Sequence, residues 1–206
     1  MGLLKMHHTR RRSVPFGTVL LTTIALLLYL FPAVNASLVF ERNHIGQIWR
    51  LVTCHFVHWN FEHLAWSVGT FWVLGILSEK ENREAFLGCV GLSALSIPIA
   101  LWMLMTNLEH YGGLSGIDSA LFVLIAVGLI REKRQAGDRL LVCAGVLVLG
   151  AFLGKIGVEF FTSNPVFVSE GSGLAPVPLA HLVGGVVGAA VASLPRAALR
   201  LPWALL

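Results

Sequence analysis

Ser115 stands out in this apolar sequence because its type and surroundings could support nucleophilic chemistry. It lies in the sequence Gly-Gly-Leu-Ser-Gly at 112–116, at the start of an apolar run. Glycines on both sides permit a tight loop, and the amides at a helix start point toward developing negative charge. A serine needs a neighbouring base to act as a nucleophile, and neutral imidazole is the usual one. The alternative is a serine that bonds its own backbone at a packed helix terminus.

The candidate base is His181, in the sequence Ala-His-Leu-Val-Gly-Gly-Val-Val-Gly at 180–188. Gly184 and Gly188 form a small-xxx-small face that permits close helix packing, and His181 lies near that face. We therefore expect the imidazole to point at a neighbouring helix. A lone histidine in a helix also fits a purely structural role.

The elements that position these residues are apolar enough to cross a membrane. The chain has 206 residues, 56% hydrophobic and 13% charged, with a mean hydropathy of +0.76, whereas soluble domains are about 45–50% apolar and 25% charged. A membrane span needs about 20 mostly apolar residues. Six stretches approach that length: 16–34, 60–78, 85–106, 115–130, 140–161 and 178–194. They predict an all-α membrane protein with a single domain over 1–206, a short basic segment at 1–15 and a short tail at 195–206.

Lysine and arginine set the expected orientation, because short loops rich in them stay in the cytoplasm. They precede the first stretch, separate the second from the third and the fourth from the fifth, and follow the sixth; the other loops hold only Arg42 and Arg50. Both termini are therefore expected in the cytoplasm, with Ser115 and His181 near the outer ends of their spans. The basic residues are spread over four loops, so no nucleic-acid partner is expected. A cleaved signal peptide ending near 33–36 is the alternative reading of the first stretch.

Three charged residues at membrane depth also need partners, because such groups are costly when unpaired. Asp118 lies one turn after Ser115, and we hypothesise that it orients His181 through a hydrogen bond. Lys155 and Glu159 are spaced i, i+4 and predict a mutual ion pair, with a role in substrate gating as the alternative.

Other polar and small residues have simpler readings. Ser67 and Ser119 are the alternative partners for the aspartate at 118. Gly150 and Gly154 repeat the four-residue spacing of small residues and predict a close-packed face on the fifth stretch.

Four motifs occur in an order that is similar to that of the rhomboid family of intramembrane serine proteases. They are Trp-Arg at 49–50, His-x4-His at 58–63 where rhomboids carry HxxxxHxxxN, Gly-Leu-Ser-Gly at 113–116, and AHxxGxxxG at 180–188. The resemblance runs from about residue 49 to residue 190. The sequence of residues 58–63 and the short length of the chain also resemble the rhombosortase branch.

The resemblance implies a six-transmembrane-helix, rhomboid-like bundle that hydrolyses a peptide bond in or next to a transmembrane segment. The partners would be the lipid bilayer and single-pass or tail-anchored membrane proteins, and the site would open to the extracytoplasmic side of the cell membrane. Ser115 would be the nucleophile and His181 the base. His63, Ser67, Gly113 and the Ser115 amide would stabilise the oxyanion. No metal or cofactor is implied.

Two departures from the family pattern keep an inactive, client-binding rhomboid open as the alternative. Ser67 stands where rhomboids have an asparagine, and loss of one oxyanion donor can cost about 2.7–4 kcal/mol in the barrier. Ser119 stands where many rhomboids have an aromatic residue. A metalloprotease would need an HExxH pair, which the histidines at 55, 58 and 63 do not provide. A haem site on the second and sixth stretches is a further alternative.

Overall fold

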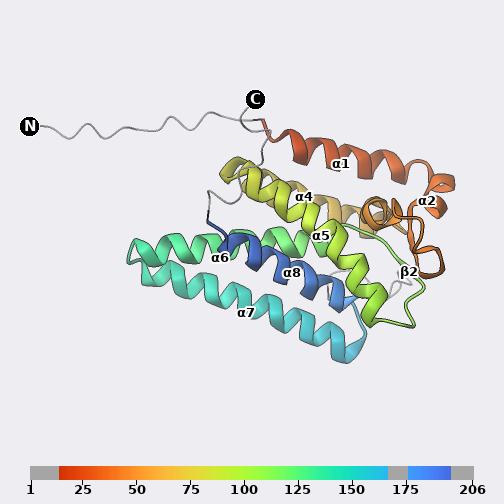
Figure 1. Cartoon of the computed structure of the whole chain (residues 1–206). Coiled ribbons are helices and arrows are strands. Elements are labelled where there is room, and N and C mark those ends of the chain that lie inside the picture. The colour runs from red at the N-terminus through yellow and green to blue at the C-terminus, as the bar shows by residue number, and fades with distance from the viewer. Residues whose placement is uncertain (1–13, 167–175, 196–206) are drawn as a thin grey trace, which may run out of the picture.

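All six apolar stretches are helical in the computed structural model, which describes residues 14–166 and 176–195 (Figure 1). The long helices are α1 (Phe16–Tyr29), α4 (Phe61–Glu81), α5 (Arg83–Leu104), α6 (Ser115–Gln135), α7 (Arg139–Thr162) and α8 (Pro178–Ser193). Short elements fill the connections: α2 (Pro32–Leu38), β1 (Phe40–Glu41), η1 (Arg42–His44), α3 (Arg50–Thr53), η2 (Cys54–Phe56) and β2 (His110–Tyr111). The predicted all-α architecture is confirmed.

The first stretch is not one straight span as predicted. α1 ends at Tyr29, and α2 begins at Pro32 after a bend of 114°. Proline lacks an amide hydrogen and disfavours helical backbone at the preceding residue, so the chain breaks before it and restarts with proline in the first turn.

By length and composition alone, fewer than six of the described helices can be identified as membrane spans. α5 and α7 are long and apolar enough to cross, and the bent α1–α2 pair would make a third span. α8 is apolar but has 16 residues. Glu62 and His63 make α4 more polar, and Asp118 lies within α6. The number of crossings therefore stays a prediction.

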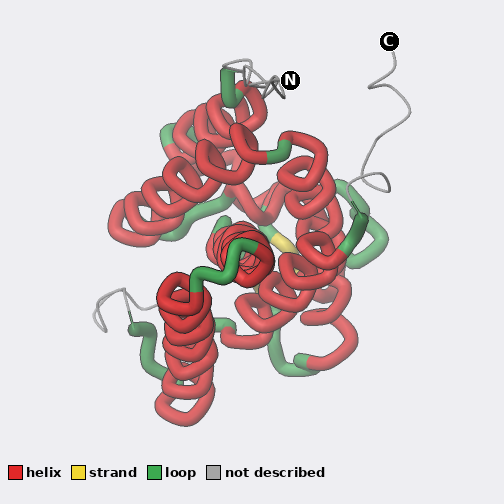
Figure 2. Tube along the Cα trace, turned by 90° about the vertical axis from the view of Figure 1, so that its left-hand side faces the viewer, coloured by secondary structure: helices red, strands yellow, loops and turns green. Residues whose placement is uncertain are grey.

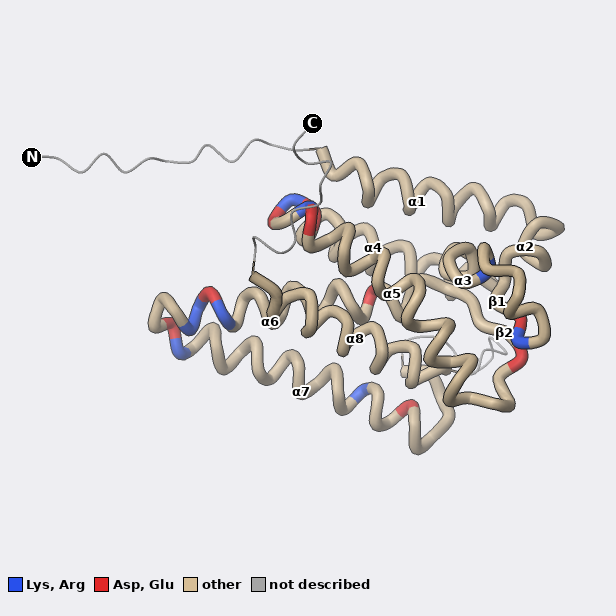
Figure 3. Tube along the Cα trace, in the orientation of Figure 1, with Lys and Arg blue, Asp and Glu red and all other residues tan. Residues whose placement is uncertain are grey.

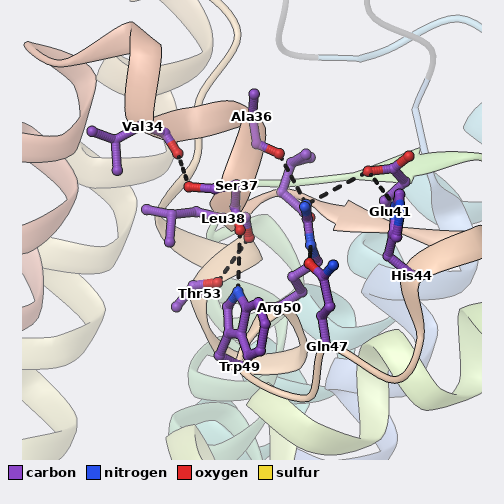
Figure 4. Close-up of polar contacts among 11 residues, drawn as sticks. Val34, Ala36, Ser37, Leu38, Glu41, His44, Gln47, Trp49, Arg50 and Thr53 are labelled. Atoms are coloured by element: carbon purple, nitrogen blue, oxygen red, sulfur yellow. Dashed lines mark hydrogen bonds and ion pairs between the residues drawn. The ribbon is translucent and has the colours of Figure 1, made fainter.

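The Trp49–Arg50 pair anchors the long connection between α2 and α4 (Figure 4). The Arg50 guanidinium is buried, and its Nη1 donates to the carbonyl oxygens of Ala36 at 2.9 Å and Val39 at 2.7 Å. The Trp49 indole donates to the carbonyl oxygen of Ser37 at 3.2 Å. Because one rigid guanidinium satisfies several backbone acceptors, this connection keeps a defined path.

A two-residue antiparallel pair ties this connection to the segment before α6. Phe40 of β1 pairs with Tyr111 of β2, and Glu41 pairs with His110. Tyr111 is four residues from Ser115, so the pairing fixes the approach of the chain to the start of α6.

α6 lies at the centre of the bundle (Figure 2) and packs most extensively on α8. Gly184 and Gly188 of α8 lie directly against the carbonyl oxygens of Gly116 and Ala120 of α6. The predicted close-packed glycine face of α8 is therefore confirmed, and it joins the two helices that carry Ser115 and His181.

α7 is attached to the bundle at few points. Its buried residues are Gly145, Ile156 and Glu159. A Cβ added at Gly150 or Gly154 would meet nothing within 4 Å in the described part of the chain, so the close-packed face predicted there is wrong. Small residues at this spacing permit close packing but do not require it.

Charged residues gather at the two ends of the bundle (Figure 3). Basic residues at one end lie in the adjoining ends of α4 and α5 and of α6 and α7: Lys80, Arg83, Arg131, Lys133, Arg134 and Arg139. Ser115, the first residue of α6, is at the opposite end of that helix. The basic residues of the two end segments lie outside the described residues: Lys5, Arg10, Arg11, Arg12, Arg196 and Arg200.

Candidate active site

A cavity of about 800 Å³ opens beside the first turn of α6 and reaches α4, α7 and α8. Eight of the residues singled out from the sequence line it: His63, Ser67, Ser115, Asp118, Ser119, Lys155, Glu159 and His181. Polar residues from four helices, far apart in the sequence, therefore line one recess whose wall is otherwise mostly apolar.

The loop before Ser115 has a conformation that only glycine adopts easily. Gly113 has φ +113°, in the region that L side chains rarely occupy. Its amide donates to the carbonyl oxygen of Cys54 at 3.0 Å. Gly113 therefore shapes the turn, and its amide is already engaged rather than free for the predicted oxyanion contact.

His63 packs against the same loop from the first turn of α4. A Cβ at Gly113 would lie 2.7 Å from Nε2 of His63, so the imidazole and this backbone are in direct contact. Asn60 caps the helix by accepting a hydrogen bond from the His63 amide at 2.8 Å. The ring centroids of His58 and His63 are 4.9 Å apart. One turn further along, Ser67 is buried at the cavity wall.

His181 is buried on α8 and has two charged neighbours on α7. Its Nδ1 lies 3.1 Å from Oε2 of Glu159 and 3.0 Å from Nζ of Lys155. Nζ and Oε2 are themselves 2.7 Å apart, which confirms the predicted ion pair between these two residues. The contact of this pair with His181 was not predicted. The common depth of Glu159 and His181 near the outer ends of their helices was the signal that could have indicated it.

The hydrogen bond predicted between Asp118 and His181 is not formed. Asp118 is buried, and its Oδ1 has no hydrogen-bond partner among residues 14–166 and 176–195. Ser119 instead donates to the carbonyl oxygen of Ser115 at 2.9 Å. The prediction failed because Nδ1 of His181 faces α7, where a longer glutamate side chain reaches it.

Ser115 and His181 line the same cavity, but no hydrogen bond joins their side chains in the described structure. Nucleophile–base contacts in unliganded enzymes are often long and tighten when substrate binds. The close contact of α6 with α8 at Gly116 and Gly184 limits how far the two residues can separate.

Two loop histidines outside the spans support the site through packing. Nε2 of His55 lies 3.1 Å from the carbonyl oxygen of Ala94, and burial lowers the pKa of His55 to about 4. Burial, followed by the proximity of His63, lowers the pKa of His58 to about 3. Both imidazoles are therefore neutral at pH 7. His55 packs edge-on against Tyr111, and His58 packs against His63.

The chain matches the sequence model of the Rhomboid domain over residues 45–197. No curated protein gave a match to the chain. The matched range includes all four motifs and every helix that lines the cavity. The apolar helices and this match together indicate an integral membrane protein, and they show that the chain belongs to the rhomboid family.

Proposed function

We propose that the protein is an intramembrane serine endopeptidase in which Ser115 is the nucleophile and His181 the general base. The observation that carries this proposal is that both side chains line one cavity, on helices held in contact by glycines. A serine and a neutral imidazole on rigid neighbouring helices are the minimum required for acyl transfer.

In the proposed reaction, Oγ of Ser115 attacks the scissile carbonyl carbon while His181 takes the hydroxyl proton. The tetrahedral intermediate then collapses, the C–N bond breaks, and His181 returns the proton to the leaving amine. Water hydrolyses the acyl-enzyme with His181 again acting as base. The Ser115 amide and His63 are the proposed oxyanion donors, with Ser67 offering a shorter hydroxyl.

The expected substrate is a single-pass or tail-anchored membrane protein. Peptide bonds in a membrane helix are hydrogen-bonded and away from water, so a protease must unwind the segment and supply water. In this proposal the cavity, through its polar side chains, admits that water. Helix-breaking residues near the cut would lower the cost of unwinding, so we expect a preference for them.

The proposed topology places both termini in the cytoplasm and the cavity toward the extracytoplasmic side. One feature supports it. The basic residues around the α4–α5 and α6–α7 turns lie at the end of α6 away from Ser115, and short segments rich in lysine and arginine remain cytoplasmic. Within this topology the whole chain forms a single transmembrane domain of six spans in the cell membrane.

A fluorophosphonate probe tests the function directly, because it reacts only with an activated serine. We expect labelling of the purified protein in detergent or liposomes, and loss of labelling in Ser115→Ala. Ser119→Ala is the matched control one turn along the helix and should still be labelled. Folded wild-type protein that takes up no label would overturn the proposal in favour of a rhomboid that binds membrane clients without cutting, as the residues at 67 and 119 would allow.

A further inference from the structure

We propose that Glu159 of α7 is a positioning residue for His181, so that the site works as a Ser-His-Glu triad in which Lys155 steadies the carboxylate. This inference rests on the proposed function of Ser115 and His181. It assigns a catalytic support to α7, a helix that contributes neither the nucleophile nor the base.

The carboxylate of Glu159 is fixed through both of its oxygens. Oε2 is 3.1 Å from Nδ1 of His181 and 2.7 Å from Nζ of Lys155. Oε1 accepts a hydrogen bond from the amide of Val166 at 3.2 Å. The side chain is 3% exposed. A buried carboxylate with this many donors has little freedom to rotate, as a group that orients an imidazole requires.

The reaction itself determines which neighbour of Nδ1 matters. When His181 takes the serine proton on Nε2, the imidazole becomes a cation with a hydrogen on both nitrogens. Nδ1 must then donate, and Oε2 of Glu159 is the acceptor at hydrogen-bond distance. The ammonium of Lys155 can only donate, so it cannot satisfy an Nδ1 hydrogen. Its role is to pair with Glu159.

The same geometry selects the resting tautomer that a base needs. With the hydrogen on Nδ1 and directed at Glu159, Nε2 keeps a lone pair for the proton of Ser115. Without the carboxylate, Lys155 would remain 3.0 Å from Nδ1 and would favour the opposite tautomer, in which Nε2 carries the hydrogen. Removal of the carboxylate therefore has two effects on His181. The neutral imidazole loses the tautomer that can accept the serine proton, and the imidazolium loses its hydrogen-bond acceptor.

Other titratable groups face the cavity and are common to all the variants used below. They are His63 from α4, His110 and Tyr111 from β2, and Asp118 from α6. The groups bonded to His181 in the described part of the chain are Lys155 and Glu159 of α7, which the variants change.

The test is the rate of fluorophosphonate labelling, and of cleavage of a transmembrane peptide, as a function of pH. In a soluble Ser-His-Asp triad the amide variant lowers kcat about 10⁴-fold, mainly through the wrong tautomer. We expect Glu159→Gln to lower the rate at least a hundredfold with little change in KM. Its remaining activity should have an acid limb at lower pH, since the imidazolium loses its acceptor.

Three further variants separate positioning from general destabilisation. Glu159→Asp keeps the charge but shortens the reach, so it should recover part of the rate and the wild-type acid limb. Lys155→Met keeps the acceptor and should lose less than Glu159→Gln. Glu109→Gln, an exposed carboxylate near the same end of the bundle, should behave like wild type.

Wild-type rate and pH profile in folded Glu159→Gln would overturn the inference while leaving the Ser115 proposal intact. If Glu159→Gln does not fold, the aspartate variant decides: an unaltered rate in Glu159→Asp would also overturn it, because the shorter side chain cannot hold the same contact. A greater loss in Lys155→Met than in Glu159→Gln would assign the role to lysine instead and would equally overturn it. Absence of labelling in wild type is a different result and concerns the proposed function alone.

Discussion

Gly184 of α8 lies so close to the carbonyl oxygen of Gly116 in α6 that a methyl group on Gly184 would overlap that oxygen. Gly116 follows the proposed nucleophile directly, and Gly184 is one turn beyond the proposed base. Backbone contact at this point sets the separation of the two catalytic helices more tightly than side-chain packing would, because a carbonyl oxygen held in a helix cannot rotate aside.

Gly184→Ala should therefore push α8 away from α6. We expect a loss of about 1–3 kcal/mol in the free energy of unfolding, typical of overpacking, together with loss of probe labelling. Unfolding in detergent with a labelling assay measures both. The matched control is Gly150→Ala on α7, where the added methyl group meets nothing within 4 Å in the described part of the chain. Equal stability of the two variants would contradict the packing shown here.

Ser67→Asn should raise activity. The serine hydroxyl at the cavity wall is short, and an asparagine amide would reach further toward the oxyanion. Removal of one such donor typically costs about 10²–10³-fold in kcat, so we expect the asparagine to gain roughly tenfold. Initial rates of peptide cleavage measure the gain, and Ser67→Ala provides the comparison. An asparagine variant no faster than the alanine variant would remove position 67 from the oxyanion site.

Asp118→Asn should keep activity within a few-fold of wild type. The carboxylate lines the cavity but makes no hydrogen bond to His181, so its charge is not required to orient the base. Asparagine preserves the shape of the side chain while removing the charge. Labelling rates at several pH values test this expectation. A drop as large as that expected for Glu159→Gln would show that the aspartate, and not α7, supports the imidazole.

The stability of the loop before α4 should fall in mild acid because of His55. Its pKa is about 4 in the folded protein because of burial, against about 6.5 when unfolded. Between these values the unfolded chain binds more protons than the folded one. The free energy of unfolding therefore decreases as pH falls, by up to about 1.4 kcal/mol per pH unit. Above pH 6.5 both states are neutral and the effect vanishes.

The comparison that isolates this effect is His55→Gln, which cannot titrate but can still donate to the carbonyl oxygen of Ala94. Unfolding of both proteins in the same detergent, from pH 7.5 to 4.5, should show a weaker pH dependence in the variant. His58 titrates in the same direction and is retained in both, so it does not obscure the difference. Parallel pH curves would show that His55 does not carry the effect.

The helices and the α6–α8 contact were predictable from local sequence features. Apolar length located each helix to within a few residues, apart from the break between α1 and α2 and the polar and charged extension of α6 to Gln135. The pattern of glycine and histidine in α8 also predicted a close-packed face correctly. These features depend on residues near one another in the chain, or on composition over a whole span.

The neighbour of His181 was not predictable in the same way. From the sequence, Asp118 is one turn from the proposed nucleophile, and Glu159 has an obvious partner in Lys155. Which carboxylate reaches the imidazole depends on how α7 and α8 are rotated about their axes, and the small, apolar residues that surround them leave that rotation undetermined. The contrast between Gly184 and Gly150 has the same cause. Both belong to pairs of glycines four residues apart, but Gly184 lies against α6, whereas Gly150 has no neighbour within 4 Å in the described part of the chain.

The size of the recess limits where a peptide can be cut. A helix about 11 Å across that rises 1.5 Å per residue occupies roughly 140 Å³ per residue. A cavity of about 800 Å³ can then receive roughly five or six residues, far short of the 20 or so in a membrane span. Most of the client helix must stay in lipid while a short end segment is drawn in. Scissile bonds should therefore cluster at the outer margin of client helices, whatever the residues at their centres.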